Sequence, residues 1–319
     1  MTTVTRPPAV APPAPAAAPA AGRRRRRLTD SAAAWAFALP VAAYLVLFFA
    51  YPLYRNIDLS LRDYTVQSFV QGNAKFIGLH NYATAIHDPV FPEAVWHTLF
   101  FTFVSLAFQY SIGLALAVFF NQSFRLSGTL RALLLVPWLL PLIVSASVWA
   151  WMLNSESGVI NSFLRALGGS NVHWLTGTPW SLISVTIANI WIGIPFNLVL
   201  LYSGLQNISE DVYEAAELDG ATAWKRFWHV TFPLLRPVSA ITLLLGFVYT
   251  LKVFDIIWII TRGGPDNTST TLATWSYQLS FGSLLPKFGP GSAVGNMLIL
   301  GALVAGVIYI RFEGKAATR

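Results

Sequence analysis

The sequence predicts an all-α, polytopic transmembrane helical bundle with six spans. Of the 319 residues, 55% are hydrophobic and only 11% are charged, whereas soluble domains carry about 25% charged residues. The apolar residues form long continuous runs, which fit helices and not the short alternating segments of a membrane barrel. Each run also reaches the roughly 20 residues that a helix needs to cross the hydrocarbon core.

The chain begins with a tail that has no apolar run. Residues 2–22 are mostly alanine and proline and cannot bury a core, so we expect residues 1–30 to form a disordered, basic tail. The five arginines Arg23–Arg27 stand directly before the first apolar run, which favours a topology anchor over a nucleic-acid patch. That run exceeds the roughly 7–15 apolar residues of a signal peptide and lacks a small-residue cleavage site. We therefore expect an uncleaved anchor helix and no nucleic-acid partner.

Six apolar runs are expected to span the membrane, and together they define a membrane domain over residues 31–311, followed by a tail over residues 312–319. If the N-terminus lies inside, most lysines and arginines fall in the inner segments, which satisfies the positive-inside rule. Both termini and the segment 208–233 are then expected in the cytoplasm. The runs are Ser31–Leu53, His97–Phe120, Ala132–Leu153, Ser181–Leu205, Val238–Ile260 and Ser292–Arg311.

The polar segment 208–233 separates the fourth and fifth runs. Ser209 is placed to cap a short helix that begins with two acidic residues, which suit the helix dipole. Gly220 permits the left-handed backbone that ends such a helix, and a second helix is expected over Ala221–Val230, before Pro233. This pattern predicts a helix–turn–helix on the inner membrane face; a plain amphipathic loop is the alternative.

The sequence carries no pattern for chemistry of its own. It contains no cysteine, no G-x-x-x-x-G-K-[ST] phosphate cradle and no nucleophile elbow, and its five histidines are scattered. We expect no catalytic residue, no metal site and no bound cofactor in this chain. The net charge of +7 reflects basic residues concentrated in the inner segments, so membrane topology explains it better than a nucleic-acid partner does.

Several segments of the chain resemble binding-protein-dependent ABC importer permeases, in particular the maltose-type first subunit of the carbohydrate branch. The outer segment Phe76–Tyr82 and the segment Thr261–Pro265 resemble the pattern of sugar-type permeases. The resemblance as a whole covers roughly Ser31–Arg311. One departure is Val230–Pro233, where Ile-x-Leu-Pro is more usual. The cytoplasmic EAA motif of that family is matched by Glu214-Ala215-Ala216, Asp219-Gly220-Ala221, Trp224, Phe227, Pro233 and Pro237.

The resemblance implies the fold of a type I importer permease and a transport function without enzymatic activity. The implied partners are a second homologous permease, two ATPase subunits that bind ATP and magnesium, an extracytoplasmic solute-binding protein, membrane lipid and a carbohydrate cargo. The implied location is the bacterial cell membrane, crossed several times. The implied ATPase-coupling residues are Glu214, Ala215, Ala216, Asp219 and Gly220, with Gly220 as the turn residue.

A carbohydrate pathway requires aromatic ring faces for stacking and amides for hydroxyl groups. Lys252 and Asp255 are spaced to share one helix face near the outer end of the fifth span, either as an interfacial pair or as a gate. An ion-coupled secondary transporter is the alternative function, but it requires acidic groups near the membrane midplane, and the spans show none deep inside. The candidate pathway residues are Asn189, Trp191, Asn197, Tyr249, Lys252, Asp255 and Asn296.

Overall fold

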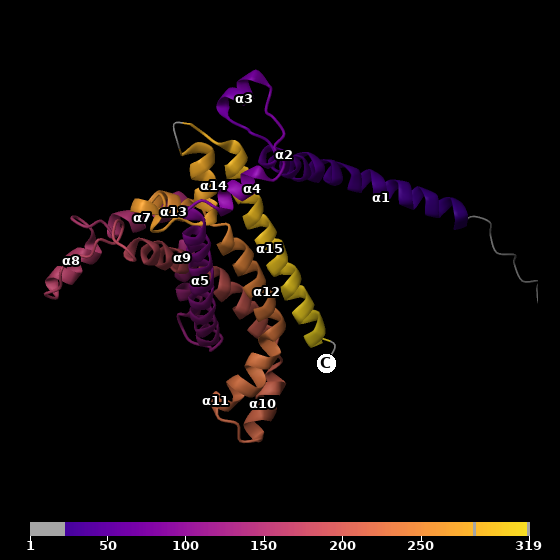
Figure 1. Ribbon diagram of the computed structural model, residues 1–319. Coiled ribbons are helices and arrows are strands. Elements are labelled where there is room, and N and C mark those ends of the chain that lie inside the picture. The colour runs from indigo at the N-terminus through magenta and orange to yellow at the C-terminus, as the bar shows by residue number, and fades with distance from the viewer. Residues whose placement is uncertain (1–22, 283–284, 318–319) are drawn as a thin grey trace, which may run out of the picture. The chain divides into compact units, whose positions relative to one another are not determined.

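The computed structural model describes residues 23–282 and 285–317, and it describes side chains between residues 34 and 311 outside that gap. Its regular structure is helical (Figure 1), with two isolated antiparallel bridges, Arg62 with Phe76 and Thr65 with Lys287. The chain divides into two compact units, residues 1–55 and 56–319. Within the described residues, five helices are long and apolar enough to cross a membrane, or six if one bent pair counts as a span.

The first unit is built from one long helical stretch. α1 (Arg23–Leu45) continues through the π-helical turn η1 (Val46–Ala50) into α2 (Tyr51–Ser60), which reaches into the second unit. The expected disordered tail 1–30 is therefore wrong for residues 23–30, because the helix of the first span extends back through the arginine run. Residues 1–22 lie outside the described residues.

Two unbroken helices, α5 (Val90–Phe120) and α9 (Trp180–Gln206), pack against each other in the second unit. Small and polar residues of α5 are buried, among them Thr102, Ser105 and Gly113. A Cβ atom on Gly113 would stand 2.5 Å from the Cβ atom of Asn197. Small residues let membrane helices approach closely, and here they bring the two backbones into near contact.

The third predicted span is not a single helix. α6 (Ser127–Leu139) and α7 (Leu142–Met152) meet at a bend of 93°. Leu140 is extended (φ −71°, ψ 144°) because the following Pro141 disfavours helical backbone before it and supplies no N–H group. The expected continuous helix Ala132–Leu153 is therefore wrong.

The fifth predicted span, Val238–Ile260, is also broken. α12 (Phe232–Leu251) has Lys252 as its C-cap, and α13 (Asp255–Ile260) begins three residues after that cap. The expectation that Lys252 and Asp255 share one helix face is wrong, because they stand on either side of the break.

The start of the fifth span also differs from the prediction. α11 (Ala223–Arg226), the π-helical turn η2 (Phe227–Thr231) and α12 run on as one helical stretch from residue 223 to 251. Pro233 lies inside this stretch, just after the π-helical turn, where it interrupts the i→i−4 hydrogen bonding because it has no N–H group. A separate helix over Ala221–Val230 is therefore wrong, and the second helix of the predicted motif is the beginning of the span.

The remaining helices of the second unit are the last candidate span, α15, and several short helices. In Figure 1, α10 and α11 lie at one end, and α4 and α14 lie at the opposite end. The helix α15 packs against α14 and α4. These elements are α3 (Val66–Gln71), α4 (His80–Ile86), α8 (Val159–Ala166), α10 (Glu210–Leu218), η3 (Pro265–Asn267), α14 (Leu272–Phe281) and α15 (Phe288–Ala317).

Candidate functional site

A cavity of about 340 Å³ lies between the unbroken pair α5–α9 and the broken helices, and we name it the central cavity. Its walls come from six helices that are far apart in the sequence. Most of the wall is apolar, with a small number of amide and hydroxyl groups. The lining residues are Gln109, Trp138, Leu142, Asn189, Ile192, Gly193, Phe196, Gly246, Tyr249, Thr250, Val253 and Ile256.

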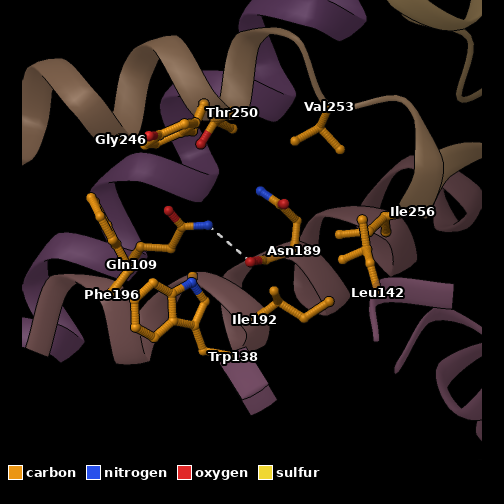
Figure 2. A pocket seen from close by; sticks show the side chains of 12 residues that line it. Gln109, Trp138, Leu142, Asn189, Ile192, Phe196, Gly246, Thr250, Val253 and Ile256 are labelled. Carbon is orange, nitrogen blue, oxygen red and sulfur yellow. Dashed lines mark hydrogen bonds between the residues drawn. The ribbon is translucent and has the colours of Figure 1, made fainter. Parts of the chain in front are cut away.

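Two amides from the unbroken helices meet in the central cavity (Figure 2). Gln109 donates from Nε2 to the backbone carbonyl of Asn189 at 2.9 Å. The side-chain amide of Asn189 points into the cavity, where its Nδ2 is buried and has no hydrogen-bond partner among the described residues. An unsatisfied buried donor costs about 1–3 kcal/mol. The cavity therefore presents one amide donor that a hydroxyl-bearing ligand would satisfy.

Aromatic rings form another part of the wall. Phe196 stands between two of them, 6.3 Å from the Trp138 ring and 5.8 Å, edge-on, from the Tyr249 ring. Lys252 places its Nζ atom 5.2 Å from the centre of the Tyr249 ring, within cation–π range. The ring faces and the amides together match the mostly apolar, sparsely polar character of small-molecule sites.

Gly193 makes room for the amide of Gln109. A Cβ atom at Gly193 would lie 2.3 Å from the Gln109 side chain. Any larger residue at this position of α9 would displace Gln109 from the carbonyl of Asn189. The helix α9 is continuous through Gly193 and through Pro195 two residues later.

The structure brings only part of the predicted pathway set together. Asn189 and Tyr249 line the central cavity, but the others do not. Trp191 is partly exposed and packs edge-on against Trp149 at 6.0 Å. Asn197 is buried at the α5–α9 contact, where its Nδ2 donates to the carbonyl of Gly193 at 2.9 Å.

Asn296 belongs to a different polar cluster. Its Oδ1 accepts from Asn56 at 2.6 Å, and its Nδ2 donates to the Tyr82 hydroxyl at 3.1 Å. Lys252 and Asp255 are both exposed at the break between α12 and α13. The contacts of Asn296 join α2, α4 and α15, so it acts there as a packing residue of the bundle end.

The sequence interpretation missed Gln109, Trp138 and Phe196. Gln109 had a usable signal, because it is the one strongly polar side chain in the middle of the second apolar run. Trp138 had no such signal, because its approach to Phe196 depends on the sharp bend after α6.

The segment 208–233 forms the second candidate region. Ser209 occupies the N-cap position of α10, as predicted, although its side chain contacts Asp211 and not a backbone N–H group. The helix ends in a Schellman motif, in which Gly220 N–H donates to Glu217 and Ala221 N–H donates to Ala216. Gly220 has φ +76°, as predicted for the turn.

An ion pair holds α10 against α11. The Arg226 guanidinium donates to the Glu217 carboxylate and lies 5.9 Å from the Tyr213 ring centre. Thr222 caps α11 through the backbone N–H of Lys225. The short helix is therefore fixed to the first turn of the long helical stretch that continues through α12.

The exposed surface of this segment includes all of the expected coupling residues except Ala216. Glu214, Ala215 and Asp219 are exposed, but Ala216 is buried against the protein itself and is inaccessible to a partner. Leu218 and Trp224 are 90% and 71% exposed. Large exposed apolar side chains mark a surface that another protein covers when they lie together. The sequence interpretation had named Trp224 as part of the motif but had passed over Leu218.

The described residues contain no group of three or more histidine, cysteine, aspartate or glutamate side chains that could hold a metal ion. Among the described side chains of segment 208–233, one ion pair is found, between Arg226 and Glu217. Neither candidate region has an arrangement for acid–base or nucleophilic chemistry.

Comparison with known proteins places the chain among transport proteins. A family model described as binding-protein-dependent transport system inner membrane component matches residues 109–317. The trehalose/maltose transport system permease protein MalF of Thermococcus litoralis is 36% identical over 86% of this chain and 90% of its own length. The lactose transport system permease protein LacF of Rhizobium radiobacter is 32% identical over 87% and 92%.

A solved structure shares the fold. The crystal structure of a bacterial ABC transporter involved in import of the acidic polysaccharide alginate superposes with a TM-score of 0.78 at 22% identity. The match covers 92% of this chain and 99% of that chain. The predicted all-α polytopic bundle is confirmed.

Proposed function

The chain belongs to the family of binding-protein-dependent transport system inner membrane components, and on that premise we propose that it imports a carbohydrate in an ATP-driven complex. It is a multi-pass membrane permease, a transport subunit of an importer. The carbohydrate assignment is supported by relatives named for trehalose and maltose, for lactose and for arabinooligosaccharides.

The buried amide of Asn189 is the observation that carries the carbohydrate proposal. Its Nδ2 lacks a partner among the described residues and faces a cavity of about 340 Å³, within the roughly 300–1,000 Å³ of small-molecule sites. A sugar hydroxyl would accept from this donor while the apolar face of the sugar ring packs on Phe196 or Tyr249. The central cavity is then the part of the translocation path that recognises the cargo.

The segment 208–233 would couple this path to ATP hydrolysis in partner subunits. An ATPase would cover Leu218 and the exposed side chains of Glu214, Ala215 and Asp219. Because α10 is tied to α11 by Arg226 and Glu217, and α11 continues into α12, movement of the segment would reach the break beside the central cavity. Coupling of this kind requires a contact that differs between two states of the complex.

The complex would further contain a second permease of the same family and an extracytoplasmic binding protein. A binding protein is supported by a related crystal structure, that of a bacterial alginate ABC transporter in complex with an alginate pentasaccharide-bound periplasmic protein. The distribution of basic residues supports cytoplasmic termini and a cytoplasmic segment 208–233. ATP and magnesium would be bound by the partner ATPases and not by this chain.

Reconstitution of the complete importer in vesicles tests the proposal. With ATP inside and ion gradients abolished, we expect uptake of trehalose, maltose or lactose that stops when ATP is withheld. Uptake driven by an ion gradient in vesicles that hold this chain alone would instead support the secondary transporter. ATP-driven uptake of a non-carbohydrate solute with none of the three sugars transported would contradict the carbohydrate assignment.

A further inference from the structure

A second cavity of about 340 Å³ lies at the end of the second unit opposite α10, and we name it the distal cavity. It is bounded by the end of α2, the helices α14 and α15 and the break after α12. Because α12 begins next to the α10 segment and runs for 20 residues, roughly 30 Å of helix separate that segment from this cavity.

Four aromatic rings line the distal cavity and contact one another in sequence. The Phe254 ring lies 4.6 Å from Tyr277, Tyr277 lies 5.4 Å from Phe281, and Phe281 lies 5.8 Å from Phe288. The break before α13 contributes Phe254, and α14 and α15 contribute the other three rings, so the wall exists only in the folded chain. The rings form one continuous aromatic surface.

Hydroxyl groups stand beside this aromatic surface. Ser280 and Ser292 line the cavity and are each 8% exposed. No hydrogen bond joins either hydroxyl to another described residue. Rings at a membrane interface usually form a belt that faces headgroups. Here the rings share an open cavity with two nearly buried hydroxyls, a combination that suits a polyhydroxylated ring.

The distal cavity and the central cavity share one short piece of chain. Val253 lines the central cavity, and the next residue, Phe254, lines the distal cavity. Both belong to the break between α12 and α13. The two cavities therefore share a short segment between two helices, which is joined to them by single backbone hydrogen bonds: Val253 N–H donates to Thr250, and the Phe254 carbonyl accepts from Trp258.

From these contacts we propose that the distal cavity is a second carbohydrate-binding site, which holds the cargo before it passes the Val253–Phe254 break into the central cavity. This inference rests on the proposed function. The ring surface stacks against the sugar, and the hydroxyls of Ser280 and Ser292 bind its hydroxyl groups. The site raises the local concentration of cargo at the break and does not take part in coupling.

Ring removal in the full-length chain tests the site. Phe281 is 64% exposed, so Phe281→Leu removes a ring face without threatening the fold, and Tyr277→Leu removes the central ring. Binding of trehalose, maltose and lactose to the chain in lipid nanodiscs is measured by saturation-transfer NMR and titration calorimetry. We expect two sites in the wild type and about tenfold weaker binding at one of them in each variant.

Two further variants make the outcome decisive. Phe163→Leu removes an equally exposed ring (65%) that lines neither cavity, and its sugar binding and thermal unfolding should equal those of the wild type. Tyr249→Leu alters the central cavity and should weaken only the other site. In the complete importer, Phe281→Leu should raise KM severalfold and leave kcat unchanged.

The possible failures are distinguishable. A single sugar site that is lost with Tyr249→Leu and unaffected by Tyr277→Leu and Phe281→Leu would overturn the second site and leave the proposed function standing. No binding of any of the three sugars by the wild-type chain would overturn both.

Discussion

The unbroken helix pair α5–α9 differs from the two broken pairs, α6–α7 and α12–α13, in its packing and in its backbone hydrogen bonding. The unbroken pair is joined through small and polar residues at near contact. The broken pairs leave backbone without helical hydrogen bonds, which membrane proteins tolerate where it is buried or lines a cavity. Both breaks border the central cavity.

The two kinds of pair also supply different groups to the central cavity. The unbroken helices supply its amides, Gln109 and Asn189, whose positions are fixed by the contact between α5 and α9. The broken helices supply the rings of Trp138 and Tyr249. The comparison teaches that both amides of the cavity stand on the unbroken helices, whereas its rings come from both kinds of pair, because Phe196 belongs to α9.

The largest effect is expected from Gly113→Val in the unbroken pair. The new side chain would overlap the Cβ atom of Asn197 at 2.5 Å and approach the backbone nitrogen of Leu198 at 3.1 Å. We expect a loss of about 3 kcal/mol in stability, the upper part of the range for overpacking, seen as a lower melting temperature in detergent. Gly301→Val is the control, because nothing lies within 4 Å of its Cβ position. If Gly113→Val and Gly301→Val melted at the same temperature, the close contact between α5 and α9 would not be what stabilises the unbroken pair.

The next effect concerns the exposed end that follows α9. Leu218→Asp changes a side chain that is 90% exposed, so folding should be unaffected. If an ATPase covers this residue, its affinity should fall about 30-fold, or about 2 kcal/mol, as for an interface hot spot. Pull-down or calorimetric titration with the partner ATPase measures it. Val70→Asp, at a side chain 78% exposed in α3, should bind normally; equal binding by both variants would remove Leu218 from the interface.

The third effect is expected at Asn189, an amide that the unbroken pair supplies to the central cavity. Replacing it should leave stability equal or higher but weaken carbohydrate binding. Asn189→Leu removes a buried unsatisfied donor at similar volume, so the melting temperature should stay equal or rise. Carbohydrate affinity should fall about tenfold at most, the value of one hydrogen bond. Uptake kinetics and thermal unfolding measure the two effects, with Asn73→Leu, an exposed amide outside both cavities, as control. A stability loss with unchanged uptake would make Asn189 a packing residue.

The smallest effect is expected at the joint between α10 and α11. Arg226→Gln removes the ion pair with Glu217, which is 62% exposed; surface pairs contribute about 0.2–1 kcal/mol. Hydrogen exchange in α10 should quicken by up to about fivefold, with little change in global stability. Lys225→Gln, the adjacent cation, should not change it. The charge-swapped pair Glu217→Arg with Arg226→Glu should restore protection, and failure to do so would assign the effect to the Tyr213 contact.

Local sequence signals determined much of this protein. The length of the apolar runs predicted the spans, because crossing the hydrocarbon core is a requirement on each segment by itself. Ser209 and Gly220 marked the ends of α10, because capping and a left-handed backbone depend on the residue and its immediate neighbours. Asn189 and Tyr249 were found because amides and aromatics are conspicuous in a membrane run.

The tertiary structure decided what no local pattern contains. Lys252 and Asp255 were placed on one face because the apolar run continues through them, yet the chain breaks between α12 and α13. Asn197 and Asn189 are both asparagines of α9, eight positions apart, and only packing sends one into the α5 contact and the other into the cavity. Whether a polar group faces a cavity or a neighbouring helix depends on distant segments, and the bend after Leu139 brings Trp138 to Phe196 for the same reason.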